Sequence, residues 1–190
     1  NKIVLPMPEL PGHHQVENAS VAITALQELG CNVMHFNDAM QKVCWPGRLQ
    51  KITTGKISPM NLGFEAELFL DGGHNPSAGI AISNWINQLQ PSNFYLILGI
   101  MKNKDLKGFL KPLAPKINKL IAIKIPNEFN AQEPEYITKI STELEITSTI
   151  AENIKDALHY ISNEDTALPK RILIGGSLYL VGEFLKLNST

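Results

Sequence analysis

Two glycine-rich turns carry the side chains best suited to ligand binding. The first turn, residues 71–76 (DGGHNP), follows the apolar run 68–70, and the second, residues 175–177 (GGS), follows the expected strand 171–174 (RILI). Glycine lets a ligand approach the backbone closely, and the N-terminus of a following helix favours an anion. The same kind of turn also occurs where a strand and a helix simply pack tightly. The residues alone therefore leave a binding site and a packing feature open as interpretations.

Three side chains in these turns have distinct chemical capacities. Asp71 places a carboxylate at a strand end, where it can accept hydrogen bonds from a ligand or cap the next helix. His74 can transfer a proton or act as a structural hydrogen-bonding group. Ser177 stands at an expected helix start, where N-capping is its default role. Because Asp71 is expected in a loop, we expect its substitution to affect ligand binding more than melting temperature.

Strands and helices that would hold these turns alternate after residue 48. The expected strands span residues 49–56, 65–70, 94–100, 120–125, 146–150 and 171–174, and the expected helices begin near residues 76, 104, 135, 151 and 177. This alternation predicts an α/β fold with a mostly parallel, Rossmann-like sheet and helices on both faces. Ligands of such sheets bind at the carboxyl ends of the strands, where both turns are expected.

A separate helical pattern precedes this region. Apolar residues at positions 16, 19, 22, 23, 26 and 29 predict an amphipathic helix that Gly30 ends, and residues 31–44 are expected to hold a second, shorter helix. The sequence Trp-Pro-Gly at 45–47 then breaks the pattern. We therefore predict a domain boundary that separates residues 1–44 from residues 45–190.

Composition excludes several classes of protein. The 190 residues include 17 Lys and Arg against 18 Asp and Glu, for a formal charge of -1. This balance predicts neither a nucleic-acid partner nor a membrane surface as partner, and no apolar run reaches the about 18 residues of a membrane span. The two cysteines, Cys31 and Cys44, have no metal-ligand spacing, which favours a reducing, cytoplasmic location.

Four segments together carry a more specific signal. They are residues 12–19 (GHHQVENA), 45–50 (WPGRLQ), 70–76 (LDGGHNP) and 176–183 (GSLYLVGE). In order and spacing they resemble motifs of the folylpolyglutamate synthase/dihydrofolate synthase family, which belongs to the Mur ligase superfamily. The resemblance implies that residues 1–44 are the tail end of the central, ATP-binding domain. It also implies that residues 45–190 are the C-terminal Mur ligase-like domain.

The resemblance implies a ligase of folate biosynthesis and one-carbon metabolism. Family members use ATP and Mg²⁺ to phosphorylate a carboxylate of dihydropteroate or tetrahydrofolate, and the amine of L-glutamate then attacks the acyl phosphate. The sequence lacks a G-x-x-x-x-G-K-[ST] loop, because the nearest string, residues 54–57 (TGKI), lacks its first glycine and its hydroxyl. We therefore expect the magnesium ligands in an N-terminal ATPase domain that this chain lacks. We also expect the chain alone to be inactive and to bind ATP weakly or not at all, and the protein to be a monomer.

Five residues are implied as site residues by their positions in the motifs. Asn18, Arg48 and Asp71 are implied in ATP binding, His74 in catalysis and glutamate binding, and Ser177 in glutamate binding, with no metal ligand in the chain. Local alternatives remain for each of them. Asn18 can bond to its own helix start, and Arg48 can be a solvated surface residue.

Two other functions remain open. One is a non-catalytic Rossmann-like module for nucleotide binding or assembly, and the other is the C-terminal domain of a cell-wall Mur ligase. The spelling of residues 70–76 favours the folate branch, since the cell-wall branch usually has tyrosine after the aspartate. A phosphate-binding loop encoded upstream would distinguish the ligase from the isolated module.

Overall fold

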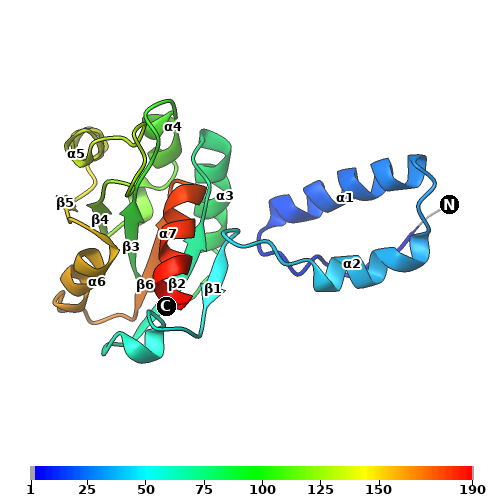
Figure 1. Cartoon of the computed structure of the whole chain (residues 1–190), viewed down its shortest axis with the longest axis horizontal. Helices are drawn as coiled ribbons and strands as arrows, with labels where there is room; N and C mark the ends of the chain where they lie inside the picture. The colour runs from blue at the N-terminus through cyan, green and yellow to red at the C-terminus, as the bar shows by residue number, and fades with distance from the viewer. Residues whose placement is uncertain (1–2, 190) are drawn as a thin grey trace.

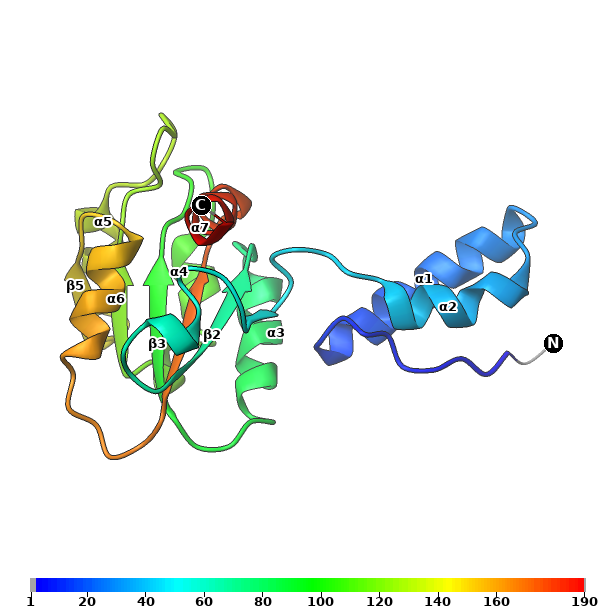
Figure 2. The same ribbon diagram turned by 60° about the horizontal axis from the view of Figure 1, so that its bottom comes forward.

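The computed structural model describes residues 3–189, apart from the side chain of His13. A pair of helices projects from a larger unit built around a sheet (Figures 1 and 2). The pair consists of α1 (His13–Glu28) and α2 (Phe36–Lys42), joined through a short 3-10 helix, η1 (Val33–His35). Gly30, at a φ of 77°, ends α1 in the left-handed conformation that the sequence predicts for it.

The larger unit contains a six-stranded sheet in the order β1-β2-β6-β3-β4-β5. Its strands are β1 (Gln50–Ile52), β2 (Ala66–Asp71), β3 (Asn93–Leu98), β4 (Lys119–Ala122), β5 (Ser148–Ile150) and β6 (Lys170–Gly175). Edge strand β1 is antiparallel to β2, and the other neighbouring strands are parallel. The predicted α/β fold with a mostly parallel sheet is confirmed.

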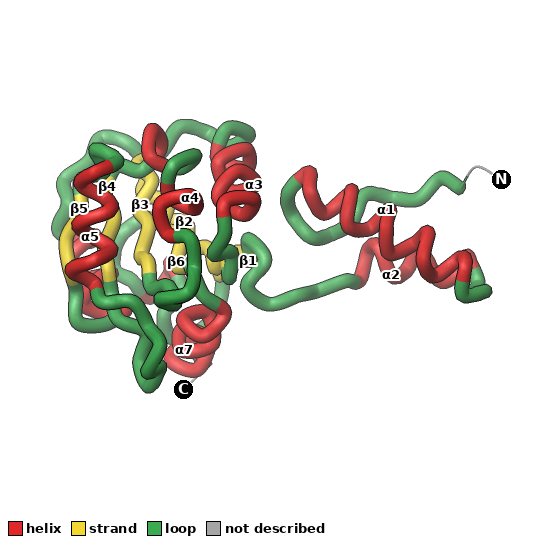
Figure 3. The backbone as a smooth tube through the Cα atoms, turned by 90° about the horizontal axis from the view of Figure 1, so that it is seen from above, coloured by secondary structure: helices red, strands yellow, loops and turns green. Residues whose placement is uncertain are grey.

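Helices cover both faces of the sheet (Figure 3). They are α3 (Pro76–Ile86), α4 (Leu106–Leu110), α5 (Pro134–Glu143), α6 (Ile154–Ser162) and α7 (Leu178–Ser189), with 3-10 helices η2 (Pro59–Asn61) and η3 (Ala114–Lys116). One apolar core joins the sheet to α3, α4 and α5, and a second joins it to α6 and α7. Successive side chains of β3 enter opposite cores, as the two-residue period of a strand requires: Leu96 enters the first core and Ile97 the second.

Several expected strands are shorter in the structure, among them β5, which covers 148–150 of the expected 146–150. Strand β1 covers only 50–52 of the expected 49–56, because Leu49 has a φ of 44° and Gly55 a φ of 106°, and both conformations turn the chain out of an extended path. Strand β4 ends at Ala122, although residues 120–125 were expected to be extended.

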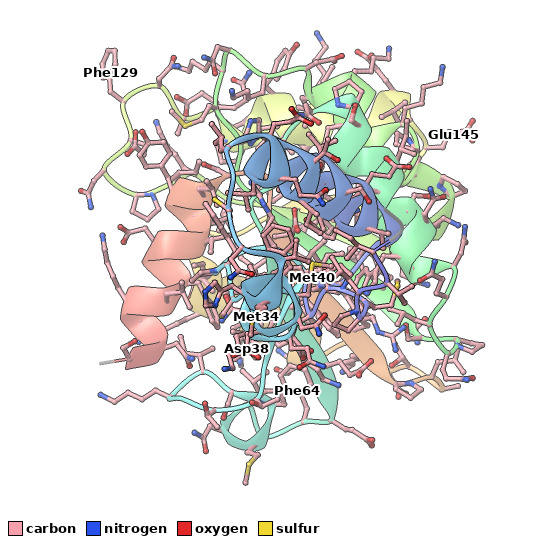
Figure 4. The ribbon with its side chains drawn as sticks, turned by 90° about the vertical axis from the view of Figure 1, so that its right-hand side faces the viewer. Met34, Asp38, Met40, Phe64, Phe129 and Glu145 are labelled. Carbon is pink, nitrogen blue, oxygen red and sulfur yellow. The ribbon has the colours of Figure 1, made fainter. Side chains whose placement is uncertain are left out.

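The apolar face of α1 is only partly covered. Val16, Ala19 and Ile23 are half-buried and line a groove that the N-terminal arm also lines, whereas Leu26 is 40% exposed and Leu29 is 79% exposed. Figure 4 views the molecule from the side on which the helical pair projects and labels Met34, which is 82% exposed. The sequence predicts the amphipathic helix, but within residues 3–189 much of its apolar stripe faces solvent. None of the described helices is long and apolar enough to span a membrane.

Arg171, on β6, ties together the amino-terminal edge of the sheet. Its guanidinium pairs with Glu67 of β2, with Nε 2.7 Å from Oε2, and its Nη1 donates to the carbonyl of Gln90 at 2.9 Å and to Ser92 Oγ at 2.7 Å. The side chain of Arg171 is only 8% exposed. Although burial raises the pKa of Glu67, hydrogen bonds from Lys51 and Arg171 outweigh it and lower that pKa.

We predict that Arg171→Met lowers the free energy of unfolding by about 2 kcal/mol, because three acceptors lose a buried cationic donor while Glu67 keeps partial access to water. Urea unfolding measures the change. Lys107→Met is the control, since Lys107 pairs with Glu143 where both side chains are exposed to water, and loss of this ion pair should change the free energy of unfolding little. Equal losses for the two variants would contradict a stabilising role for the Arg171 cluster.

Candidate functional site

A pocket of about 220 Å³ lies where the start of α1 meets the carboxyl end of β2. Asn18 reaches it from α1, Arg48 from the segment before β1, Asp71 from the end of β2, and His74 from the turn between β2 and α3. Residues more than 50 positions apart in the sequence therefore line one cavity. Four of the five predicted site residues are brought together there, and Ser177 is not among the lining residues.

Asp71 is the best-anchored side chain of the pocket. It is the last residue of β2 and only 7% exposed, so the expectation that it lies in a loop outside the core is wrong. Its Oδ2 accepts a hydrogen bond from the Leu49 amide at 2.8 Å, and its Oδ1 accepts one from the Gly73 amide at 2.7 Å. Burial raises the pKa of Asp71, while these two hydrogen bonds and the nearby charges of Arg48 and His14 oppose the rise.

Arg48 lies near this carboxylate, and no described residue is its direct partner. Among the described residues its half-buried guanidinium forms neither a hydrogen bond nor an ion pair, although its charge acts on both Asp71 and His14. Leu49, the next residue, is buried and has a φ of 44°, a conformation that leucine rarely adopts. Strained backbone of this kind is concentrated at functional sites. The arrangement presents to the pocket a cation that pairs with none of the described residues.

A chain of side-chain hydrogen bonds runs along the first turn of α1. The Asn18 amide donates to Gln15 Oε1 at 3.3 Å, and Gln15 Nε2 lies 2.9 Å from His14 Nε2. Because an amide nitrogen only donates, His14 Nε2 must accept, which places the imidazole proton on Nδ1. Burial lowers the pKa of His14. The charges of Asp71 and Glu17 act to raise this pKa and the charge of Arg48 acts to lower it, and the net result is a lowered pKa. The side-chain oxygen of Asn18, Oδ1, has no partner among the described residues and can accept a hydrogen bond from a ligand.

His74 is held by its own turn. Its Nδ1 lies 2.8 Å from the carbonyl of Gly72, so Nδ1 donates, and in the neutral ring the lone pair is on Nε2. The next residue, Asn75, caps α3 by accepting from the Ala78 amide at 2.9 Å, and Pro76 occupies the first turn. The half-buried imidazole thus has one nitrogen fixed and one available for hydrogen bonding or proton transfer.

Ser177 performs a capping task at the neighbouring strand end. It is 3% exposed, and its Oγ accepts from the Tyr179 amide at 3.1 Å at the start of α7. Strand β6 runs beside β2, with Gly175 opposite Asp71, so Ser177 belongs to the same edge of the sheet. A contact between Ser177 and a ligand remains a prediction.

Sequence reasoning missed two backbone features and one side-chain contact. The left-handed conformations of Gly47 and Leu49 flank Arg48, and Gln50 Oε1 accepts from the Gly47 amide at 3.1 Å. All four residues lie in the motif segment 45–50, so the resemblance of that motif was the sequence signal that pointed to them. Within residues 3–189, no group of three His, Cys, Asp or Glu side chains is placed to hold a metal ion.

Comparisons with known proteins identify relatives of the chain. The family described as "Dihydrofolate synthetase, C-terminal domain" matches residues 57–187. The dihydrofolate synthetase of Saccharomyces cerevisiae is 27% identical over 95% of this chain and 45% of its own length. The dihydrofolate synthase/folylpolyglutamate synthase of Buchnera aphidicola from Acyrthosiphon pisum is 31% identical over 79% of this chain and 33% of its own length.

A similar fold occurs in a solved structure. The Mycobacterium tuberculosis folylpolyglutamate synthase complexed with ADP and AMPPCP superposes with a TM-score of 0.80 and 22% identity, over 99% of this chain and 42% of that protein. The chain therefore spans less than half the length of these relatives.

We predict that Asp71→Asn lowers the free energy of unfolding by about 1–3 kcal/mol, because an amide offers one acceptor oxygen and leaves a buried backbone N–H unpaired. Asp105→Asn is the matched control: Asp105 caps α4 by accepting only from the Gly108 amide, at 2.8 Å, and asparagine caps about as well as aspartate. Urea unfolding of both variants measures the difference. Similar stabilities for the two would show that the double acceptor at Asp71 is not needed by the fold.

Proposed function

Because the chain belongs to the dihydrofolate synthetase C-terminal domain family, we propose that it is the C-terminal portion of an ATP-dependent ligase that joins L-glutamate to dihydropteroate or a folate. The observation that carries the proposal is the convergence of Asn18, Arg48, Asp71 and His74 on one pocket. Residues 1–44 would be the end of the ATP-binding domain, and residues 45–190 the C-terminal domain. The protein would act as a cytoplasmic monomer.

The pocket fits one wall of a nucleotide site. Its volume of about 220 Å³ is smaller than the roughly 300–1,000 Å³ of a complete ligand pocket. Arg48 offers a planar cation that can stack on a base or pair with phosphate oxygens. Asn18 offers an acceptor and a donor for a base edge, and each Asp71 oxygen keeps a lone pair for a ribose hydroxyl. The triphosphate and Mg²⁺ would be bound by the preceding ATPase domain.

His74 fits a role close to the transferred groups. A carboxylate is a poor electrophile, so its conversion to an acyl phosphate makes attack by the glutamate amine feasible. The glutamate ammonium must lose one proton before its nitrogen can attack and another as the amide forms, and an imidazole whose Nε2 is available can accept one of them. The bond from Nδ1 to Gly72 fixes the ring orientation that this role requires. Ser177, from the neighbouring strand end, would lie toward the glutamate.

The helical pair suits an incomplete domain. Its contacts with the sheet unit include those between α1 and α3, while Leu29 at its far end is 79% exposed. An apolar stripe left open in this way is expected where further elements of the ATP-binding domain pack against it.

We predict that the whole protein forms a glutamyl product from dihydropteroate or tetrahydrofolate only when ATP, Mg²⁺ and L-glutamate are all present. Chromatography of the product with each component omitted in turn tests this. The proposal is wrong if neither acceptor is ligated while a cell-wall precursor is.

We predict that Arg48→Gln in the whole protein raises the KM for ATP about tenfold to a hundredfold, since a hydrogen bond to a charged group contributes about 1.5–3 kcal/mol. The melting temperature should change little, because Arg48 has no partner to lose within the described residues. Lys51→Gln, three positions further on edge strand β1 and paired with Glu67 where both side chains reach water, should leave the KM unchanged. An unaltered KM for Arg48→Gln would remove Arg48 from the nucleotide site.

A further inference from the structure

The backbone on both sides of Arg48 is held in an uncommon conformation. Gly47 has a φ of 74° and Leu49 a φ of 44°, so Arg48 stands between two left-handed residues. Glycine adopts this conformation freely, but leucine does so only when surrounding contacts impose it. A Cβ on Gly47 would also lie 2.9 Å from Val181 Cγ1 of α7, so the segment has little room to move toward that helix.

Three hydrogen bonds impose the conformation. Asp71 Oδ2 accepts from the Leu49 amide at 2.8 Å, and the Gly47 carbonyl accepts from the Gly72 amide at 2.9 Å. The third bond comes from the segment itself, since Gln50 Oε1 accepts from the Gly47 amide at 3.1 Å. Together they fix the backbone before and after Arg48.

Gln50 is the contributor that no ligand role explains. It is the first residue of β1, half-buried, and opposite Leu70 in the register with β2, and it does not line the pocket. Gly47 is buried, so without the Gln50 oxygen its amide would lose its partner where water has poor access. The turn would then relax toward a less strained backbone, and the direction of the Arg48 side chain would change with it.

We propose that Gln50 is a positioning residue that aims Arg48 at the nucleotide by bonding to the amide of Gly47. The proposal rests on the nucleotide role proposed for Arg48. A guanidinium that is already oriented when the ligand arrives loses less conformational freedom on binding, which increases affinity. Gln50 would therefore act on ATP binding without touching ATP.

The test uses the variant Gln50→Met in the whole protein, because methionine keeps the length of the side chain but has no amide oxygen. We expect the KM for ATP to rise fivefold or more, with kcat changed by less than about twofold, because binding of substrate and transition state weakens equally. Gln50→Asn, which shortens the side chain and withdraws the acceptor from Gly47, should give the same result if Gln50→Met does not fold.

A double-variant cycle separates positioning from a general loss of structure. If Gln50 acts through Arg48, adding Gln50→Met to Arg48→Gln should raise the KM for ATP no further than Arg48→Gln does alone. The proposal would be overturned if the rise in the KM for ATP of the double variant were the product of the two single rises. It would also be overturned if both Gln50 variants had an unchanged KM.

The matched control is Gln132→Leu. Gln132 Oε1 also accepts from a backbone amide, that of Glu133 at 3.0 Å, but near the start of α5 and outside the pocket. Loss of this Gln132 hydrogen bond should leave the KM for ATP unchanged. Absence of ATP-dependent ligation in the unsubstituted protein would refute the proposed function, whereas normal ligation with a KM insensitive to Gln50 would refute only the positioning role.

Discussion

The carboxylate of Asp71 connects the two segments on which the pocket depends. One oxygen holds the amide of Leu49 and the other holds the amide of Gly73, so a single side chain joins the entry to β1 with the exit from β2. Both bonds are buried, and a buried backbone N–H without an acceptor is strongly disfavoured. The positions of Arg48 on one side and His74 on the other follow from this contact.

The surrounding glycines serve packing as much as ligand access. A Cβ on Gly175 would lie 2.4 Å from the carbonyl oxygen of Asp71, and a Cβ on Gly72 would lie 2.3 Å from Leu178 Cδ2. The carboxyl ends of β2 and β6 and the start of α7 can therefore approach closely only without those side chains. Of the two interpretations that the second glycine-rich turn left open, tight packing explains its observed geometry, and Ser177 adds a helix cap.

The sequence predicted the general arrangement because its signals are periodic or carried by motifs. Buried strands such as β3 are continuous apolar runs, and the motif resemblance assigned Asn18, Arg48 and Asp71 to one binding site, three residues that line one pocket in the structure. Conformations set by distant contacts could not be predicted in this way. The left-handed Leu49 depends on an acceptor 22 positions later, which no local preference indicates.

The burial of individual side chains was the other property that could not be predicted from the sequence. Asp71 is a polar residue at a strand end, and its burial to 7% exposure comes from distant segments, among them the Leu49 backbone and Gly175 of β6. The apolar stripe of α1 shows the converse, since amphipathic spacing predicts a face suited to burial without specifying what covers it. Leu26 and Leu29 satisfy the pattern and remain exposed in residues 3–189.

A structure of the whole protein with bound ADP tests the central claim most directly. We predict that the nucleotide occupies the pocket with the Arg48 guanidinium in contact with it, while Asp71 still accepts from the amides of Leu49 and Gly73. A nucleotide bound elsewhere, or one in this pocket that does not touch Arg48, would contradict the account.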